Sequence, residues 1–161
     1  AESGEEIKEI QAHDQEVVCL DYSPFISSLN EYTLASGSRD WMIHIFSSKD
    51  NYGNVSNLDD HTSSIVALKF CFDPKEREDS KRLKIISSGA DKAIIYWNYD
   101  EITNEQSLYH KEVFKNNKIV SMDVVDTKIV AGHDKLLTVT DISYKIRIFE
   151  KKPEKIKASG S

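Results

Sequence analysis

The sequence predicts an all-β fold that repeats one antiparallel unit three times. In residues 34–47 (LASGSRDWMIHIFS), 85–98 (IISSGADKAIIYWN) and 129–142 (IVAGHDKLLTVTDI), two apolar, β-rich runs flank a polar turn. Such a pattern is typical of a β-hairpin. The turn aspartates lie 51 and 43 residues apart, at Asp40, Asp91 and Asp134. A hairpin repeated at roughly 40 to 50 residues has the period of a β-propeller blade.

The three hairpins share further details around the turn. A glycine stands two or three residues before each aspartate, and an aliphatic residue stands three residues after it, at Ile43, Ile94 and Leu137. Many short strands separated by turns are typical of an all-β domain. We therefore expect three four-stranded antiparallel blades, one leading outer strand and a tail, with these bounds: strand 5–11, blades 12–58, 59–114 and 115–150, and tail 151–161.

The first unit opens with an alternating stretch, EEIKEIQ at residues 5–11, which predicts the leading edge strand. Residues 17–22 form an apolar run with two valines and predict the first strand of the blade. The hairpin follows at residues 32–46, and residues 54–58 predict a short outer strand.

The second unit contains the most hydrophobic run of the chain, IVALKFCF at residues 65–72. A continuous apolar run of this length predicts a strand that is covered on both faces. The hairpin spans residues 83–97, and residues 106–114 predict the outer strand. Residues 74–82 (PKEREDSKR) are a mixed-charge insertion, read as a solvated loop or, alternatively, as a docking site.

The third unit begins with a strand at residues 119–125, followed by a hairpin at residues 128–140. The strict alternation of YKIRIFE at residues 144–150 predicts its outer strand. The basic tail at residues 151–161 ends in glycine and serine, and we expect it to be frayed.

The composition suits a globular chain and narrows the classes of partner. The chain has 161 residues, 39% of them hydrophobic and 30% charged. Its net charge of −6 argues against a nucleic-acid-binding face, which needs basic residues. No apolar run approaches the roughly 20 residues of a membrane span, so we expect no membrane partner. Cys19 and Cys71 lie in apolar strand patterns and predict buried thiols, with a disulfide as the alternative.

The second unit carries four polar residues at a fixed spacing. His61 opens the unit, Ser87 stands four residues before Asp91, and Trp97 stands six residues after it. This set resembles the WD-repeat family, in which such residues form a hydrogen-bonded chain within each blade. The chemistry suits that chain, because an indole N–H only donates, a carboxylate only accepts, and histidine and serine do both. The alternative is that these are unrelated surface groups.

The other two units depart from the pattern. In the first, His13, Ser36 and Asp40 match, but Phe46 replaces the tryptophan and has no hydrogen to donate. The third keeps only its turn aspartate. There the histidine, serine and tryptophan positions hold, in order, Asn116 and Asn117, Val130, and Thr140. We expect the third blade to rest on apolar packing, with Asp134 capping only the turn.

A closer resemblance covers roughly residues 8–100. The segments HDQEVVCLDYS, LASGSRDWMIHIF, LDDHTSSIVALKF and ISSGADKAIIYW are similar to the WD-repeat scaffold family of mitogen-activated-protein-kinase-binding and microcephaly-associated spindle-pole proteins. Beyond residue 100 only KIVAGHDKLLTVTD fits, and it fits the general WD pattern. The resemblance implies a cytoplasmic, cytoskeleton- or centrosome-associated scaffold for kinase signalling or the spindle. Kinase-docking tails lie outside the propellers in that family, so no docking residue is carried over.

The sequence carries no pattern that indicates catalysis. It has no phosphate-binding GxxxxGK[ST] loop, no HExxH and no GxSxG, and its five histidines lack metal-ligand spacing. We therefore expect no catalytic residue, no cofactor and no metal. A protein–protein interaction scaffold is the leading prediction. A propeller subunit of a nuclear RNA-processing or chromatin complex is the alternative, and an enzymatic propeller ranks third.

Two predictions concern partners. WD propellers commonly bind on the face that carries the aspartate turns, where Arg39, Trp41 and His133 lie in this sequence. Arginine and tryptophan are enriched among binding hot spots, although Trp41 could instead pack on a neighbouring blade. Because a propeller closes with typically 4 to 8 blades, we also expect this chain to be part of a longer propeller or to pair with a second copy.

Overall fold

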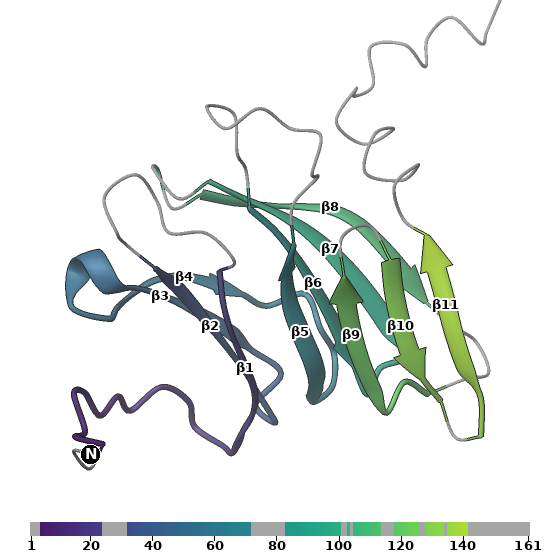
Figure 1. Cartoon of the computed structure of the whole chain (residues 1–161), viewed down its shortest axis with the longest axis horizontal. Coiled ribbons are helices and arrows are strands. Elements are labelled where there is room, and N and C mark those ends of the chain that lie inside the picture. The colour runs from purple at the N-terminus through teal and green to yellow at the C-terminus, as the bar shows by residue number, and fades with distance from the viewer. Residues whose placement is uncertain are drawn as a thin grey trace, which may run out of the picture.

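The computed structural model describes residues 4–23, 32–71, 83–100, 103, 105–113, 118–125, 128–133 and 135–141. These residues form eleven β-strands and one short 3-10 helix at Ser48–Asp50 (Figure 1). The all-β prediction is confirmed. Among the described residues, no helix is long and apolar enough to cross a membrane.

The strands form three antiparallel sheets that follow the three predicted units. The first sheet contains β1 (Val17–Tyr22), β2 (Thr33–Ser38), β3 (Ile43–Ser47) and β4 (Gly53–Leu58). The second contains β5 (Ile65–Cys71), β6 (Leu83–Gly89), β7 (Ala93–Asp100) and β8 (Glu105–Val113). The third contains β9 (Ser121–Val125), β10 (Lys128–Gly132) and β11 (Leu137–Asp141).

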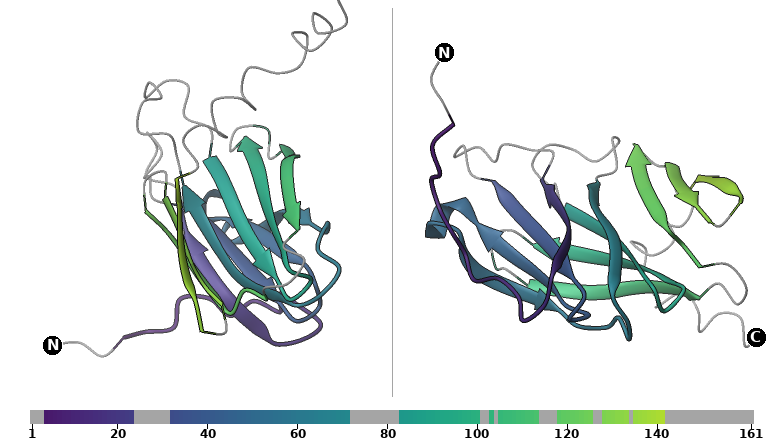
Figure 2. Two further views of the ribbon diagram at one scale, coloured as in Figure 1. Left: turned by 90° about the vertical axis from the view of Figure 1, so that its right-hand side faces the viewer. Right: turned by 90° about the horizontal axis from the view of Figure 1, so that it is seen from below.

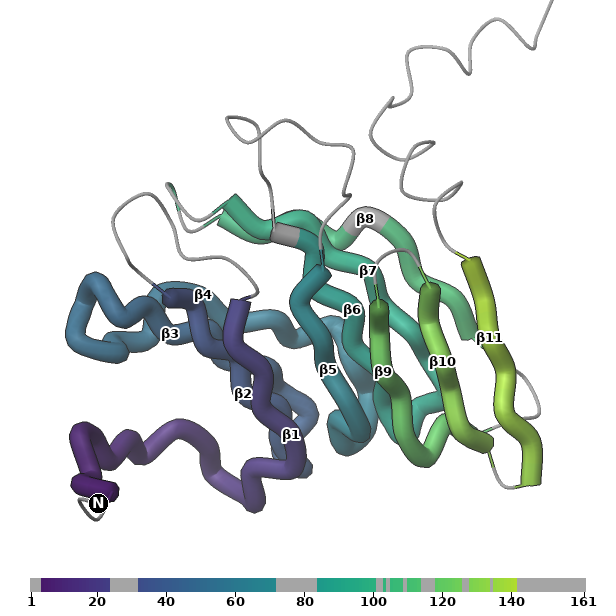
Figure 3. The backbone as a smooth tube through the Cα atoms, viewed as in Figure 1, coloured from purple at the N-terminus to yellow at the C-terminus, as the bar shows by residue number. Residues whose placement is uncertain are grey.

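Each sheet is a meander in which consecutive strands are neighbours. The first strands of the three sheets, β1, β5 and β9, lie side by side, and the remaining strands fan outward from them (Figures 1 and 3). Figure 2 shows the three sheets as successive layers. This arrangement is consistent with neighbouring blades of a WD-repeat propeller.

The predicted leading strand at residues 5–11 is wrong. Residues 4–16 are described and contain no strand, and Ile7 is 89% exposed. The physical reason is that a strand is defined by pairing. In the WD pattern this stretch pairs with the preceding blade, and the described chain contains no sheet before β1.

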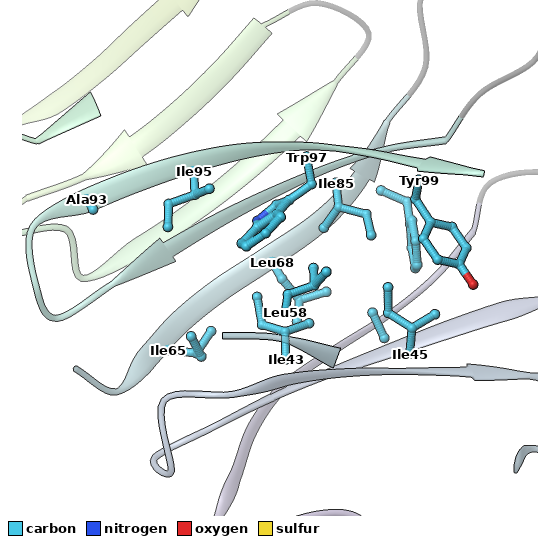
Figure 4. Packing of buried hydrophobic residues seen from close by; sticks show 12 residues of the cluster. Ile43, Ile45, Leu58, Ile65, Leu68, Ile85, Ala93, Ile95, Trp97 and Tyr99 are labelled. Carbon is cyan, nitrogen blue, oxygen red and sulfur yellow. The ribbon is translucent and has the colours of Figure 1, made fainter. Parts of the chain in front are cut away.

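The prediction that residues 65–72 form a strand covered on both faces is confirmed for β5. One face of the second sheet packs on the first sheet through a cluster that includes Leu68, Ile85 and Trp97 (Figure 4). The other face packs on the third sheet through a second cluster that includes Ala67 and Met122. The second sheet is therefore the centre of the core.

The remaining predictions concern the two cysteines, the outer strands, the charged insertion and the C-terminal segments. Cys19 and Cys71 are free thiols; Cys71 is buried as predicted, whereas Cys19 is only half-buried. Burial raises the pKa of each thiol, to about 11 for Cys19 and about 12 for Cys71. The predicted outer strands of the first two units are present as β4 and β8. The insertion at 74–82, the strand at 144–150 and the tail at 151–161 lie outside the described residues.

Candidate functional site

Four side chains of the second sheet form a continuous hydrogen-bonded chain. His61 Nδ1 lies 3.0 Å from Asp91 Oδ2, and His61 Nε2 lies 2.8 Å from Ser87 Oγ. Trp97 Nε1 donates to Ser87 Oγ over 3.1 Å. The directions are consistent: the His61 Nδ1–H donates to the carboxylate, the serine hydroxyl donates to His61 Nε2, and the indole donates to the serine. The four residues that the sequence pattern singled out thus lie together in the structure, and their polar side-chain atoms are hydrogen-bonded to one another.

The Asp91 carboxylate also fixes the turn between β6 and β7. It accepts hydrogen bonds from the backbone N–H groups of Thr62 at 2.9 Å and Ala93 at 3.1 Å. Burial acts to raise the pKa of Asp91, but the bonds from Thr62 and His61 outweigh it, and the pKa is lowered. Burial also lowers the pKa of His61, which favours the neutral ring that the chain of donors requires. A Cβ at Gly89 would lie 2.6 Å from both Asp91 Oδ1 and His61 Nδ1, so glycine is needed there.

The first sheet carries a shorter version of the same network. His13 Nδ1 lies 2.9 Å from Asp40 Oδ2, and His13 Nε2 lies 2.7 Å from Ser36 Oγ. Phe46 is only 3% exposed, so it packs at the tryptophan position without donating. The ring of His44 contacts His13 edge to face, with the centroids 4.3 Å apart.

His13, Asp40 and His44 are also close enough to hold a metal ion, since one ligand atom from each lies within 4.8 Å of the others. However, both ring nitrogens of His13 already take part in the network. A metal ion would have to displace at least one of these hydrogen bonds. The geometry is therefore accounted for by the repeat network.

The third sheet corrects one assignment made from the sequence. Ile129 pairs with Thr140 as Ile85 pairs with Trp97, so Thr140 does occupy the tryptophan position. The next pair, Val130 and Val139, lies on the opposite face of the sheet, and the second pair along, Ala131 and Thr138, lies on the same face as Ile129.

The corresponding pair in the second sheet is Ser87 and Ile95. Ala131, and not Val130, therefore stands at the serine position, because the third turn is one residue shorter. Asp134, Asn116 and Asn117 lie outside the described residues.

His133, which directly follows β10, contributes to the interface between the second and third sheets. Its Nε2 lies 3.2 Å from Thr138 Oγ1, and its Nδ1 is buried with no hydrogen-bond partner among the residues that the structure describes. The side chain lines a cavity between the second and third sheets. The predicted role of His133 in partner binding beside Arg39 and Trp41 stays a prediction.

The turn between β2 and β3 carries the other two candidate residues. The Arg39 side chain is 61% exposed and forms an ion pair with Glu16 at 3.2 Å. Trp41 is 52% exposed and has a backbone φ of 75°. Asp40 holds this turn in place, because its carboxylate accepts from the backbone N–H groups of Met42 at 3.0 Å and Asp14 at 3.2 Å.

Comparison with known proteins identifies the repeat. The family model described as "WD domain, G-beta repeat" matches residues 4–47, which contain the network of the first sheet. This stretch is thus similar to one WD repeat. The three antiparallel sheets are accordingly consistent with WD-repeat propeller blades, as the sequence predicts.

The relatives agree with the closer resemblance. The chain is 42% identical over 92 residues to WD repeat-containing protein 62 of Sus scrofa, which covers 57% of the chain and 5% of that protein. It is 38% identical over 91 residues to mitogen-activated protein kinase-binding protein 1 of Homo sapiens, which covers 56% of the chain and 6% of that protein. The chain thus matches only a small part of the length of these relatives.

Proposed function

We propose that this WD-repeat chain is part of a non-catalytic scaffold that binds other proteins, and that Arg39 and Trp41 are contact residues. One observation carries the proposal: an exposed tryptophan is held in a strained backbone conformation on a rigid turn. Trp41 lies in the left-handed region, which bulky residues rarely adopt. Lys92 has the same conformation at the corresponding turn position, so Trp41 is distinguished by the exposed aromatic ring that this turn carries.

The surroundings of Trp41 support a binding role. The Asp40 carboxylate joins the backbone of Met42 within the turn to that of Asp14 in the segment before β1. The turn is therefore held in place, and Trp41 loses little conformational freedom when it binds a partner. Arg39 adds a charged group close to Trp41 in the sequence, and its guanidinium forms an ion pair with Glu16. An aromatic anchor beside an arginine is a combination enriched at the energetic centre of protein interfaces.

The test uses Trp41→Gly in the full chain, with Lys92→Gly as the matched control. Lys92 follows Asp91 as Trp41 follows Asp40, and it also has a positive φ, of 65°. Glycine adopts this conformation without strain, so neither variant should lower the melting temperature. Partner capture from lysate should fall for Trp41→Gly and stay unchanged for Lys92→Gly. Equal capture by Trp41→Gly and the wild type would disprove the contact.

For the biological role, we propose kinase-signalling or spindle scaffolding in the cytoplasm, associated with the cytoskeleton or centrosome. The support is the similarity to a protein whose name states that it binds mitogen-activated protein kinase. The alternative, a nuclear RNA-processing or chromatin propeller, is less favoured because the net charge is −6. Pull-down with purified kinases and with RNA separates the two: RNA retention without kinase retention would support the alternative.

We further propose that the three sheets are blades at residues 12–58, 59–114 and 115–150, and that more blades or a second copy cover the two outer faces. On the first sheet, Leu20 pairs with Ser36 on the outer face and is 61% exposed. On the third, Val139 pairs with Val130 on the outer face and is also 61% exposed. Repeat units normally bury such faces against their neighbours.

A further inference from the structure

A cavity of about 130 Å³ lies between the second and third sheets. Its walls include Ile94 and Tyr96 of β7, Ile129 and Ala131 of β10, His133 after β10, and Thr140 of β11. Thr140 is exposed, so the cavity opens along β11. No residue of the Arg39–Trp41 turn lines it, so this site is separate from the proposed contact surface.

The cavity coincides with the place that the other repeats fill with an aromatic ring. Thr140 pairs with Ile129, as Trp97 pairs with Ile85 in the second sheet. Trp97 is 2% exposed and belongs to the cluster packed between the first and second sheets (Figure 4). Threonine lacks the indole, so the corresponding space between the second and third sheets is left open.

The facing walls correspond as well. In the first sheet, Ile43 and Ile45 stand three and five residues after the turn aspartate and belong to the same cluster as Trp97. In the second sheet, Ile94 and Tyr96 stand at the same distances from Asp91 and line the cavity. The surface that packs against Trp97 between the first and second sheets thus has a counterpart between the second and third sheets, where the aromatic ring is missing.

The size and chemistry of the walls indicate what the cavity would take. An engineered apolar cavity of about 150 Å³ binds benzene, so a volume of this order suits a small planar ring. Tyr96, which is only 3% exposed, supplies an aromatic wall, and rings prefer offset or edge contacts with one another. Ile94, Ile129 and Ala131 add apolar surface, whereas Glu112, His133, Thr138 and Thr140 place polar groups on the remaining walls.

We propose that this cavity binds a planar aromatic group, in the size range of a single ring to an indole, in the position that Trp97 occupies at the other interface. The probe is indole, titrated by calorimetry into the wild-type chain and into Thr140→Trp, which would fill the cavity from within. Indole should bind the wild type, and the affinity should fall at least tenfold in Thr140→Trp, whose melting temperature should rise. The control is Ile7→Trp, which adds an indole at an exposed residue outside the sheets.

A second variant guards against misfolding of the first. Ala131→Leu narrows the cavity from β10 and should also weaken indole binding. It replaces Thr140→Trp in the comparison if that variant loses the β-sheet signal in circular dichroism. Failure of indole to bind the wild type, or equal binding to the wild type and the filled variants, overturns the proposal.

The source of the aromatic group is decided by competition. A capped Gly-Trp-Gly peptide that displaces indole assigns the site to a tryptophan side chain of a partner protein. Indole binding without displacement by the peptide assigns it to a free small aromatic molecule. Because these measurements use purified chain and defined probes, they stand or fall independently of the Arg39–Trp41 contact.

Discussion

The two interfaces between neighbouring sheets use the same strands of the repeat, yet they are filled differently. Between the first and second sheets, Trp97 is buried and bonded to Ser87. Between the second and third, Thr140 occupies the same register and leaves a cavity of about 130 Å³. Both interfaces bury isoleucines, from β3 and β6 at the first interface and from β7 and β10 at the second. One aromatic position therefore separates a filled, hydrogen-bonded interface from an open one.

The difference extends to the polar atoms. At the first interface, histidine, serine, aspartate and tryptophan satisfy one another. At the second, Ala131 stands at the serine position. His133 contacts Thr138 with one ring nitrogen, and the other ring nitrogen is buried with no partner in the described part of the chain. A partly satisfied network is less stable than a complete one. We therefore expect the second repeat to be the most stable unit.

The largest expected effect is the loss of Trp97. Trp97→Ala should destabilise the chain by roughly 3 to 5 kcal/mol, because it removes a buried ring and a hydrogen bond. Thr140→Ala should change stability little, since Thr140 is exposed. Urea denaturation of both variants and the wild type measures the difference. A Thr140→Ala variant that is the less stable of the two would show that the register is misread.

The next largest effect is expected at the turn aspartate of the second sheet. Asp91→Ala leaves His61 and two backbone N–H groups unpaired, at a cost of roughly 1 to 3 kcal/mol. Asp40→Ala is the matched comparison and should cost less, because its network lacks the tryptophan. Equal losses in thermal melts would mean that the tryptophan does not strengthen the network.

The same carboxylate should make stability depend on pH. Because the pKa of Asp91 is lower in the folded chain than its ordinary value of 3.8, its contribution is present above that value. It is lost as the pH falls through the lower folded pKa. The fall in melting temperature from pH 6 to pH 3 should therefore be smaller in Asp91→Asn than in the wild type. Asp60→Asn, at an exposed position, is the control and should follow the wild type.

The smallest expected effect on stability concerns the outer faces. Leu20→Lys with Val139→Lys replaces exposed residues, so stability should change by only about 0.5 kcal/mol or less per site. Association should change strongly. Light scattering should give the wild type a molar mass above the 18.4 kDa of a monomer, and it should give the double variant a lower molar mass than the wild type. Ile7→Lys, which lies outside the sheets, is the control. A monodisperse wild-type monomer would contradict the proposal that these faces require cover.

The sequence by itself determined the local parts of the structure. Strand alternation and turn chemistry are properties of short segments, and they located the three hairpins, the turn aspartates and the buried run of β5. The spacing of His61, Ser87, Asp91 and Trp97 likewise identified residues that the structure brings together. These features were predictable because each depends on neighbours within one repeat.

Tertiary structure decided what depends on pairing between distant segments. Residues 5–11 alternate like a strand, but they pair with no strand in the described parts of the chain, so the alternation alone gave a wrong prediction. Counting back from Asp134 selected Val130 as the serine equivalent, whereas a turn shorter by one residue places Ala131 there. A shift of one residue exchanges the two faces of a strand, and only the pairing reveals it. The burial of His133 Nδ1 and the cavity beside Thr140 follow from packing between sheets, which no spacing within one repeat encodes.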